Sequence, residues 1–176
     1  MKVLVTYKSK TGFTKEYAEE ISKRLSADCM EIKKAKKSVM GKYDVVIHGG
    51  SIFAGMIGGL KEARANFAAS GAKKFVVFAV GATPAKVTDN IRKIEETNIT
   101  PEEKESGAFF YFQGGLRYDK MGFMSRRLMK MMANQMKKGG NVPNDDPNEV
   151  DISESYDISS PEYVVPLVDY VNSLNV

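Results

Sequence analysis

Residues 9–14 read Ser9-Lys10-Thr11-Gly12-Phe13-Thr14, directly after an apolar run and directly before a helical pattern at 15–25. A strand, a short turn rich in hydroxyls and glycine, and a helix together form an arrangement that binds phosphate groups. The first backbone N–H groups of a helix have no intrahelical partner, and the helix dipole favours an anion beside them. Hydroxyls can add hydrogen-bond donors, and glycine permits a tight turn. The stretch therefore predicts a phosphate-binding loop in an α/β fold.

The apolar runs along the chain predict five strands separated by helices. Nearly continuous Val, Ile, Leu and Phe in the first, third and fourth runs are typical of strands buried on both faces of a parallel sheet. Alternating strands and helices imply right-handed crossovers and a doubly wound sheet, for which the order 2-1-3-4-5 fits best. The expected strands lie at 2–7, 29–33, 43–48, 74–80 and 107–112.

Stretches of helical length lie between and after these strands. Pro84 suits a first helical position and Gly71 suits a helix end. The polar segment 141–160, rich in Asn, Asp, Ser and Pro, is expected to be a loop. Besides the helix at 121–138 discussed below, the expected helices are 14–26, 56–70, 84–97 and a closing helix at 161–174.

Length and composition favour one globular domain, 1–176. The apolar fraction of 43% and charged fraction of 27% exclude a disordered or fibrous chain. No apolar run reaches the roughly 18–20 residues of a membrane-spanning helix, and no leader pattern opens the chain. The single cysteine, Cys29, leaves no disulfide framework. We therefore expect a cytoplasmic protein, with no metal site and no nucleic-acid partner.

The topology predicts where a ligand binds. In doubly wound sheets, ligands lie at the carboxyl ends of the strands where the strand order reverses. That rule brings the loop at 9–14 together with the glycine-rich turn at 49–55. Several phosphate-binding folds are excluded, because the chain lacks the P-loop and dinucleotide glycine patterns, acids at the end of the first strand, and a loop cysteine.

The loop resembles the FMN phosphate loop of flavodoxins, whose pattern Thr/Ser-x-Thr-Gly-x-Thr it matches position by position. The resemblance implies a flavodoxin-like fold. It also implies that the FMN phosphate is held by Ser9, Lys10, Thr11, Gly12, Phe13 and Thr14. The turns after the third and fourth strands would flank the isoalloxazine ring, through Ser51, Ile52, Phe53, Ala54 and Gly55 on one side and Gly81, Ala82 and Thr83 near the other.

Some of these residues have a second interpretation. Lys10 is either a ligand or a solvated side chain, and Phe53 either contacts the ring or anchors its own loop. The third turn carries no Tyr or Trp that could stack on a flavin. His48, the only histidine, is expected to be buried and hydrogen-bonded rather than catalytic, because no carboxylate or cysteine partner is evident.

A basic, methionine-rich segment follows the fifth strand. Residues 117–138 contain seven Lys or Arg and one acid, whereas 141–162 contain seven acids and no base. Such a helix either packs its apolar face on the sheet or presents it, with a cationic rim, to an anionic membrane surface or acidic ligand. The apolar face is expected to comprise Met121, Met124, Leu128, Met131, Met132 and Met136.

The residues around this segment resemble one particular group of flavodoxin-like proteins. Gly-x-Leu-Arg-Tyr at 114–118, followed by the basic helix and Gly139-Gly140, is similar to the flavodoxin-like, menaquinone-dependent protoporphyrinogen oxidase group. That resemblance implies an insertion at about 117–160, a porphyrin-type substrate and a quinone as electron acceptor. Arg117 and Tyr118 follow a strand end on the ligand side, so they are candidates for substrate contact. A surface ion pair is the alternative for Arg117.

Four functions remain open at this point. The leading hypothesis is an FMN-dependent oxidoreductase that resembles protoporphyrinogen oxidase, with peripheral membrane contact through 121–138. The second is a flavodoxin-type electron carrier between protein partners, although carriers are usually acidic and this chain has a net charge of +4. The others are a non-catalytic FMN- or anion-binding module and an NAD(P)H:quinone reductase.

Overall fold

A parallel sheet forms the centre of the fold in a computed structural model that describes residues 1–105, 108–138 and 151–176. Its strands follow the order β2-β1-β3-β5-β6, and each neighbouring pair is parallel. This is the predicted order 2-1-3-4-5 when only these five strands are numbered, and the single α/β domain is confirmed. The strands are β1 (Val3–Lys8), β2 (Asp28–Glu31), β3 (Val45–Phe53), β5 (Lys74–Gly81) and β6 (Phe109–Gln113).

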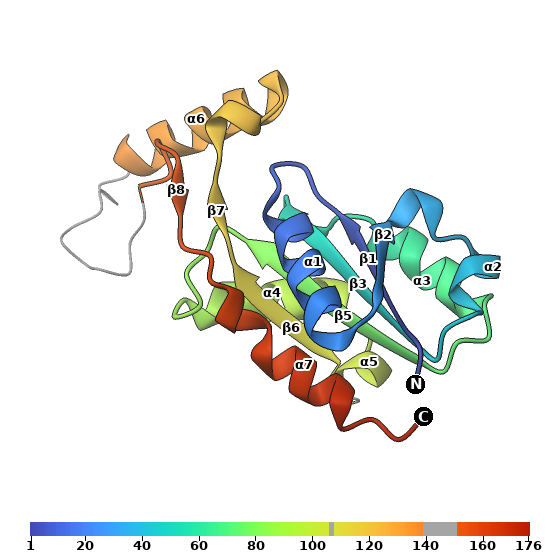
Figure 1. The fold of residues 1–176 in the computed structure, drawn as a ribbon. Helices are drawn as coiled ribbons and strands as arrows, with labels where there is room; N and C mark the ends of the chain where they lie inside the picture. The colour runs from blue at the N-terminus through green and yellow to red at the C-terminus, as the bar shows by residue number, and fades with distance from the viewer. Residues whose placement is uncertain (106–107, 139–150) are drawn as a thin grey trace.

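Helices cover both faces of the sheet (Figure 1). Alternate residues of a strand point to opposite faces, so Val45 and Ile47 pack against one set of helices and Val46 against the other. The first face is covered by α1 (Phe13–Leu25) and α7 (Val165–Asn172). The second face is covered by η1 (Ile32–Lys34), α2 (Lys37–Met40), α3 (Leu60–Ala68) and α4 (Thr88–Asn98), and α5 (Pro101–Glu105) follows α4.

The prediction of a helix at 56–70 is wrong at its beginning. Met56 and Ile57 form β4 (Met56–Ile57), which pairs antiparallel with the end of β3. The reversal depends on positive φ angles at Ala54 (49°) and Gly55 (77°). The Asn98 side chain then fixes the turn, because it accepts a hydrogen bond from the N–H of Ile57 (2.9 Å) and donates one to the carbonyl of Gly55 (2.7 Å).

Other boundaries also differ from the predictions. β3 runs on to Phe53, so the glycines expected to open a turn lie within the strand. The helix predicted at 84–97 begins only at Thr88, and the N–H of Ala85 before it donates to the Gln113 side chain (2.8 Å). The run at 29–33 leaves the sheet after Glu31 and continues as η1, and the closing helix opens with a 3₁₀ turn, η3 (Pro161–Val164).

An extension projects from the ligand side of the sheet, and we call its described residues, 115–138 and 151–157, the arm. It contains β7 (Gly115–Leu116), η2 (Tyr118–Lys120), α6 (Phe123–Lys138) and β8 (Tyr156–Asp157). The prediction of a loop at 141–160 is wrong at Tyr156 and Asp157, which form β8 and pair with β7. Residues 139–150 lie outside the described part of the chain. Figure 1 shows α6 standing apart from the sheet, at the end opposite both termini. Within the described ranges, no helix combines the length and the apolar character needed to cross a bilayer.

His48 is buried at the end of the core, as predicted. Its ring is fully inaccessible, with Nδ1 3.0 Å from the Thr6 hydroxyl and Nε2 3.0 Å from the carbonyl oxygen of Gly58. These contacts join β1 and β3 to the turn before α3. Burial lowers the pKa of His48 to about 4, so the ring is neutral at pH 7.

The glycines of β3 allow close packing that no other residue permits. A Cβ at Gly49 would lie 1.9 Å from the ring of Phe78, so Gly49→Ala should overpack the core and lower the free energy of unfolding by about 1–3 kcal/mol. Urea denaturation measures this change. Gly122→Ala is the matched control, because nothing lies within 4 Å of the added methyl group. Equal stabilities for the two variants would contradict the packing argument.

The buried His48 should make the protein less stable in mild acid. The unfolded chain takes up a proton near pH 6.5 but the folded chain only near pH 4, so stability is complete above pH 6.5 and falls as the pH drops between these values. The loss reaches at most about 3 kcal/mol. Urea denaturation at pH 7 and pH 4.5 measures the free energy of unfolding, which should change less between these pH values in His48→Gln than in the wild type. If His48→Gln and the wild type lose the same free energy of unfolding between pH 7 and pH 4.5, this role of His48 is ruled out.

Candidate functional site

The predicted phosphate loop closes on itself and opens α1. Gly12 has a φ of 107° and donates its N–H to the Ser9 hydroxyl (3.1 Å), which makes the turn. The helix then begins at Phe13, and its first-turn N–H groups have no intrahelical acceptor. The positive end of the helix dipole therefore lies at this loop, as an anion site requires.

The Thr14 hydroxyl is the clearest sign of a missing ligand. Thr14 is 1% exposed, and its Oγ1 is buried without any hydrogen-bond partner. A buried hydroxyl left without a partner costs about 1–3 kcal/mol, so such groups are rare in folded proteins. This one lies in the first turn of α1 and lines a pocket. An anion bound at the helix start would give it an acceptor, so the loop fits the phosphate of FMN.

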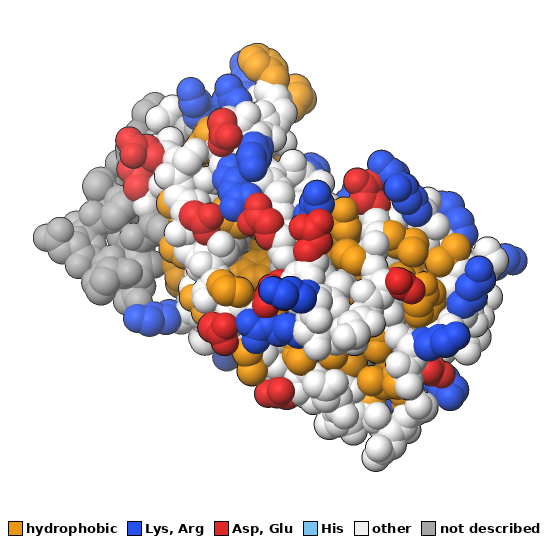
Figure 2. Space-filling view, viewed as in Figure 1, with side chains coloured by type: hydrophobic (Ala, Val, Ile, Leu, Met, Phe, Trp, Pro, Cys, Tyr) orange, Lys and Arg blue, Asp and Glu red, His pale blue; other side chains and the backbone are white. Residues whose placement is uncertain are grey.

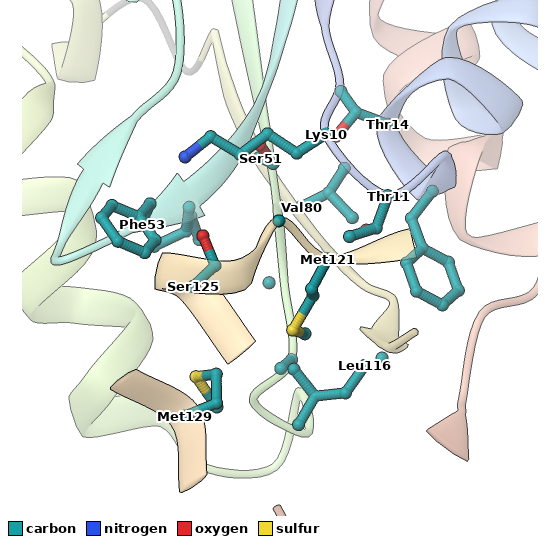
Figure 3. A pocket seen from close by; sticks show the side chains of 16 residues that line it. Lys10, Thr11, Thr14, Ser51, Phe53, Val80, Leu116, Met121, Ser125 and Met129 are labelled. Carbon is teal, nitrogen blue, oxygen red and sulfur yellow. The ribbon is translucent and has the colours of Figure 1, made fainter. Parts of the chain in front are cut away.

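The second loop borders the same pocket. Ser51, Ile52 and Phe53 end β3 and line the pocket, whereas Ala54 and Gly55 form the turn beyond it. Phe53 is 42% exposed, so it is no core anchor. The Lys10 ammonium lies 4.2 Å from the centre of its ring, a cation–π contact that joins the first and second loops (Figure 3).

The third loop is held by two tyrosines. The Tyr156 hydroxyl of β8 donates to the carbonyl of Ala82 (2.8 Å), and the Tyr111 hydroxyl of β6 donates to that of Thr83 (2.6 Å). Burial raises the pKa of both hydroxyls, so both stay protonated donors at neutral pH. Gly81 and Ala82 line the pocket, whereas Thr83 does not. Tyr156 thus ties the arm to this loop.

The three loops meet in one pocket (Figure 3). The topology predicts this for the first and second loops, and the resemblance to flavodoxins implies it for the third. Of the predicted FMN-binding residues, five do not line it: Ser9, Gly12, Ala54, Gly55 and Thr83. The nine that do are Lys10, Thr11, Phe13, Thr14, Ser51, Ile52, Phe53, Gly81 and Ala82.

The arm supplies a second wall that the sequence reasoning missed. Figure 3 shows Met121, Ser125 and Met129 on the side of the pocket opposite Lys10 and Ser51. The unusual composition of the segment signalled a function, but not which face of the helix would point inward. The lining residues not predicted are Val80, Gly115, Leu116, Met121, Gly122, Ser125 and Met129.

The apolar face predicted for α6 does not cover the sheet. Met121 reaches the pocket, but Met124, Met131 and Met132 are exposed, and Leu128 is half-buried. The side chain of Met136 lies outside the described part of the structure. A different face, carrying Ser125, Met129 and the buried Ala133, points inward. Of the two interpretations of this helix, packing of the methionine face on the sheet as core is therefore wrong for the three exposed methionines.

Arg117 fastens the arm to the phosphate loop. Its guanidinium pairs with Glu16 of α1 (2.5 and 2.9 Å) and with Asp157 of β8 (3.1 Å). It also lies 3.7 Å from the centre of the Phe13 ring. The hydrogen bonds to Glu16 raise its pKa, so it remains charged. Arg117 does not line the pocket. Its ion pairs fit the alternative interpretation of this residue, a surface ion pair rather than a contact with substrate.

Tyr118, the other candidate for substrate contact, also points elsewhere. Its hydroxyl donates to the carbonyl of Ile152 (2.7 Å), and its N–H donates to the Ser155 hydroxyl (3.0 Å). It borders a separate surface hollow with Arg126 and Lys130. The structure thus places both candidates in the framework of the arm rather than in the wall of the pocket.

Thr14→Val tests the unpartnered hydroxyl, because valine keeps the shape and removes the polar atom. Without ligand, the variant should be more stable than the wild type by about 1 kcal/mol in urea denaturation. Its affinity for FMN, measured by quenching of flavin fluorescence, should fall about tenfold or more, because a hydrogen bond to a charged phosphate is lost. Thr97→Val, which removes an exposed hydroxyl, is the control. A less stable variant with unchanged FMN affinity would exclude a ligand at Thr14.

Solved structures with a similar fold are flavodoxins and related flavoproteins, at low identity. A flavodoxin, WrbA-like protein from Agrobacterium tumefaciens is 19% identical, with a TM-score of 0.45, and the match covers 64% of this chain and 82% of that one. Flavodoxin 2 from Bacillus cereus is 19% identical, with a TM-score of 0.41 and coverages of 64% and 84%. A flavoprotein from Bacteroides eggerthii is also 19% identical, with a TM-score of 0.41 and coverages of 74% and 96%.

A search of curated proteins finds no match. A family model described as a flavodoxin domain, however, matches residues 4–142. Apart from Val3 at the start of β1, that range contains the five strands of the parallel sheet, all three loops of the pocket and the whole of α6. The chain belongs to the flavodoxin-domain family.

Proposed function

We propose that the protein is an FMN-dependent oxidoreductase similar to protoporphyrinogen oxidase, which takes hydrogen from a porphyrin-type substrate and passes electrons to a quinone. Bound FMN would supply the hydride and electron transfer, and the protein would supply binding, orientation and exclusion of water. The observation that carries the proposal is the second wall of the pocket. A carrier has to present its cofactor to partner proteins, whereas an enzyme also has to hold a second small molecule.

Each of the three loops would hold a different part of FMN. The first turn of α1 and the hydroxyls of Thr11 and Thr14 are available to the phosphate. Ser51, Ile52 and Phe53 would lie on one side of the ring, with Gly81 and Ala82 near the other. Because tyrosine hydroxyls already occupy the carbonyls of Ala82 and Thr83, the third loop is held rigidly before any ligand binds.

The arm wall suits a flat, apolar second reactant. Leu116, Met121 and Met129 present apolar side chains, and Ser125 adds one hydroxyl. Methionine side chains are flexible and polarisable, so they adapt to aromatic surfaces. Reduced porphyrins and quinones both have large apolar rings with few polar groups. Such a wall would also keep water from the reacting atoms.

The alternative function is electron transfer between protein partners. The exposed Phe53 and Met56 beside the pocket favour it, because exposed apolar residues at the rim of a cofactor site suit protein docking. Under this alternative, the arm would contribute to the partner interface and no small substrate would turn over.

Anaerobic turnover tests the proposal. The FMN-loaded protein should oxidise protoporphyrinogen with a water-soluble naphthoquinone as acceptor, and do so faster than it oxidises NADH or NADPH. Met129→Glu should raise KM for the porphyrinogen about tenfold or more, because a charge in the apolar wall has to be desolvated. Asn134→Glu adds the same charge to an exposed position of α6 and is the matched control.

Two results would contradict the proposal. Electron exchange with a reduced ferredoxin, without turnover of any small molecule, would establish the carrier alternative. A protein that binds no FMN in a fluorescence titration would exclude both redox functions.

A further inference from the structure

Most of the large apolar side chains that are exposed in the described part of the chain lie on α6. Large apolar residues are rarely left exposed in a group unless they meet a partner or a membrane. Among the described side chains of α6 there are four: Phe123 is 77% exposed, Met124 80%, Met131 51% and Met132 43%. Figure 2 shows apolar side chains protruding from α6 beside Lys and Arg side chains.

The helix has two different faces. Ser125, Met129 and Ala133 are spaced four residues apart and point inward, towards the pocket and the body. Met124 and Met131, seven residues apart, share another side of the helix and stay in solvent. More than two fifths of each of these four side chains is in solvent, so packing against the described residues does not account for them. We call the side of α6 that carries Met124 and Met131 the outer stripe.

The charges of α6 are of one sign. Phe123–Lys138 contains five Lys or Arg and no acid. The Arg126 guanidinium donates to the carbonyl of Tyr118 (2.6 Å), so this cation is turned inward. Arg127 and Lys130 are exposed, and they lie at the border of the outer stripe. We call Phe123, Met124, Arg127, Lys130, Met131 and Met132 the outer face of α6.

The positive charge of α6 favours an anionic membrane over a second copy of the chain as the partner of the outer face. A second copy of the chain would bring another α6 with five cations against the first, and like charges in contact are destabilising. An anionic bilayer surface complements the cations and also takes up the apolar side chains. An apolar stripe flanked by Lys and Arg is the pattern of helices that lie in the membrane interface. At about 1.5 Å per residue, α6 is about 24 Å long, enough for such contact.

We propose that the outer face of α6 docks the protein on an anionic lipid membrane, with the helix axis parallel to the surface. Its apolar side chains enter the boundary between head groups and acyl chains, and Arg127 and Lys130 pair with lipid phosphates. The inner face of the same helix lines the pocket, so docking brings the pocket to the membrane surface. The inference concerns the surface of the arm and holds for either redox function.

Co-sedimentation with vesicles tests the docking. The FMN-loaded full-length protein should bind phosphatidylglycerol-rich vesicles, and bind phosphatidylcholine vesicles much more weakly. Binding should weaken about tenfold or more at 1 M salt, where the Debye length is about 3 Å. The double variant Met124→Ser/Met131→Ser should lose about tenfold or more in affinity, because two apolar side chains no longer leave water. Met56→Ser, which removes a similarly exposed methionine outside the arm, should bind like the wild type.

A fluorescent reporter locates the contact. The chain contains no tryptophan, so Phe123→Trp introduces a single probe at an exposed position of the outer face. Its emission should shift to shorter wavelength when phosphatidylglycerol-rich vesicles are added, since the indole enters an apolar environment. Met56→Trp places the probe at a similarly exposed position outside the arm and should shift less.

Several results would overturn the proposal. The absence of sedimentation with both kinds of vesicle would do so, as would membrane binding that neither the double methionine variant nor Arg127→Gln/Lys130→Gln weakens. Dimerisation in size-exclusion chromatography that Met124→Ser/Met131→Ser abolishes, without vesicle binding, would assign the face to a second copy. FMN affinity measured on each variant checks that it is folded and keeps this test separate from that of the redox function.

Discussion

The position of β3 between β1 and β5 is the constraint on which the rest of the structure depends. Both neighbours pair with it in parallel, and Gly49 and Gly50 let the Phe78 ring and the backbone of Gly58 approach it closely. Without side chains at these two positions, the strand continues to Phe53 and carries the second loop beside the phosphate loop. His48 fixes the opposite side of that loop through the carbonyl of Gly58. The pocket is thus a consequence of how tightly the central strand is packed.

The arm is joined to this framework at two of the ligand loops. Arg117 connects it to the phosphate loop through Glu16 and Phe13, and Tyr156 connects it to the third loop through Ala82. Arg117 directly follows β7, and Tyr156 lies in β8, so both links are made at the base of the arm. The base of the arm is therefore in direct contact with the residues around the phosphate loop. The helix can act as a wall of the pocket because its base is fixed, although most of its length stands free of the sheet.

Much of the fold could be predicted from the sequence, because continuous apolar strands and a glycine-hydroxyl turn follow local rules. The strand order and the meeting of the first two loops came from those patterns, and the place of the third loop came from the resemblance to flavodoxins. The β4 hairpin could not be predicted, since it depends on a positive φ at Ala54 and on the distant Asn98 side chain. The inward face of α6 could not be predicted either. Periodicity finds an apolar stripe, but the β7–β8 pairing decides which side of the helix meets the pocket, and that pairing joins segments forty residues apart.

The placement of the methionines has a chemical consequence. Thioethers that solvent can reach are the first to be oxidised, and a sulfoxide is polar and larger than the parent group. Met124, Met131 and Met132 are open to oxidants, whereas Met40 is sealed in the core. Oxidative stress would therefore change the outer face of α6 from apolar to polar while leaving the fold intact. Sulfoxide reduction would restore it, so the affinity of the protein for an apolar surface would follow the redox state of its surroundings.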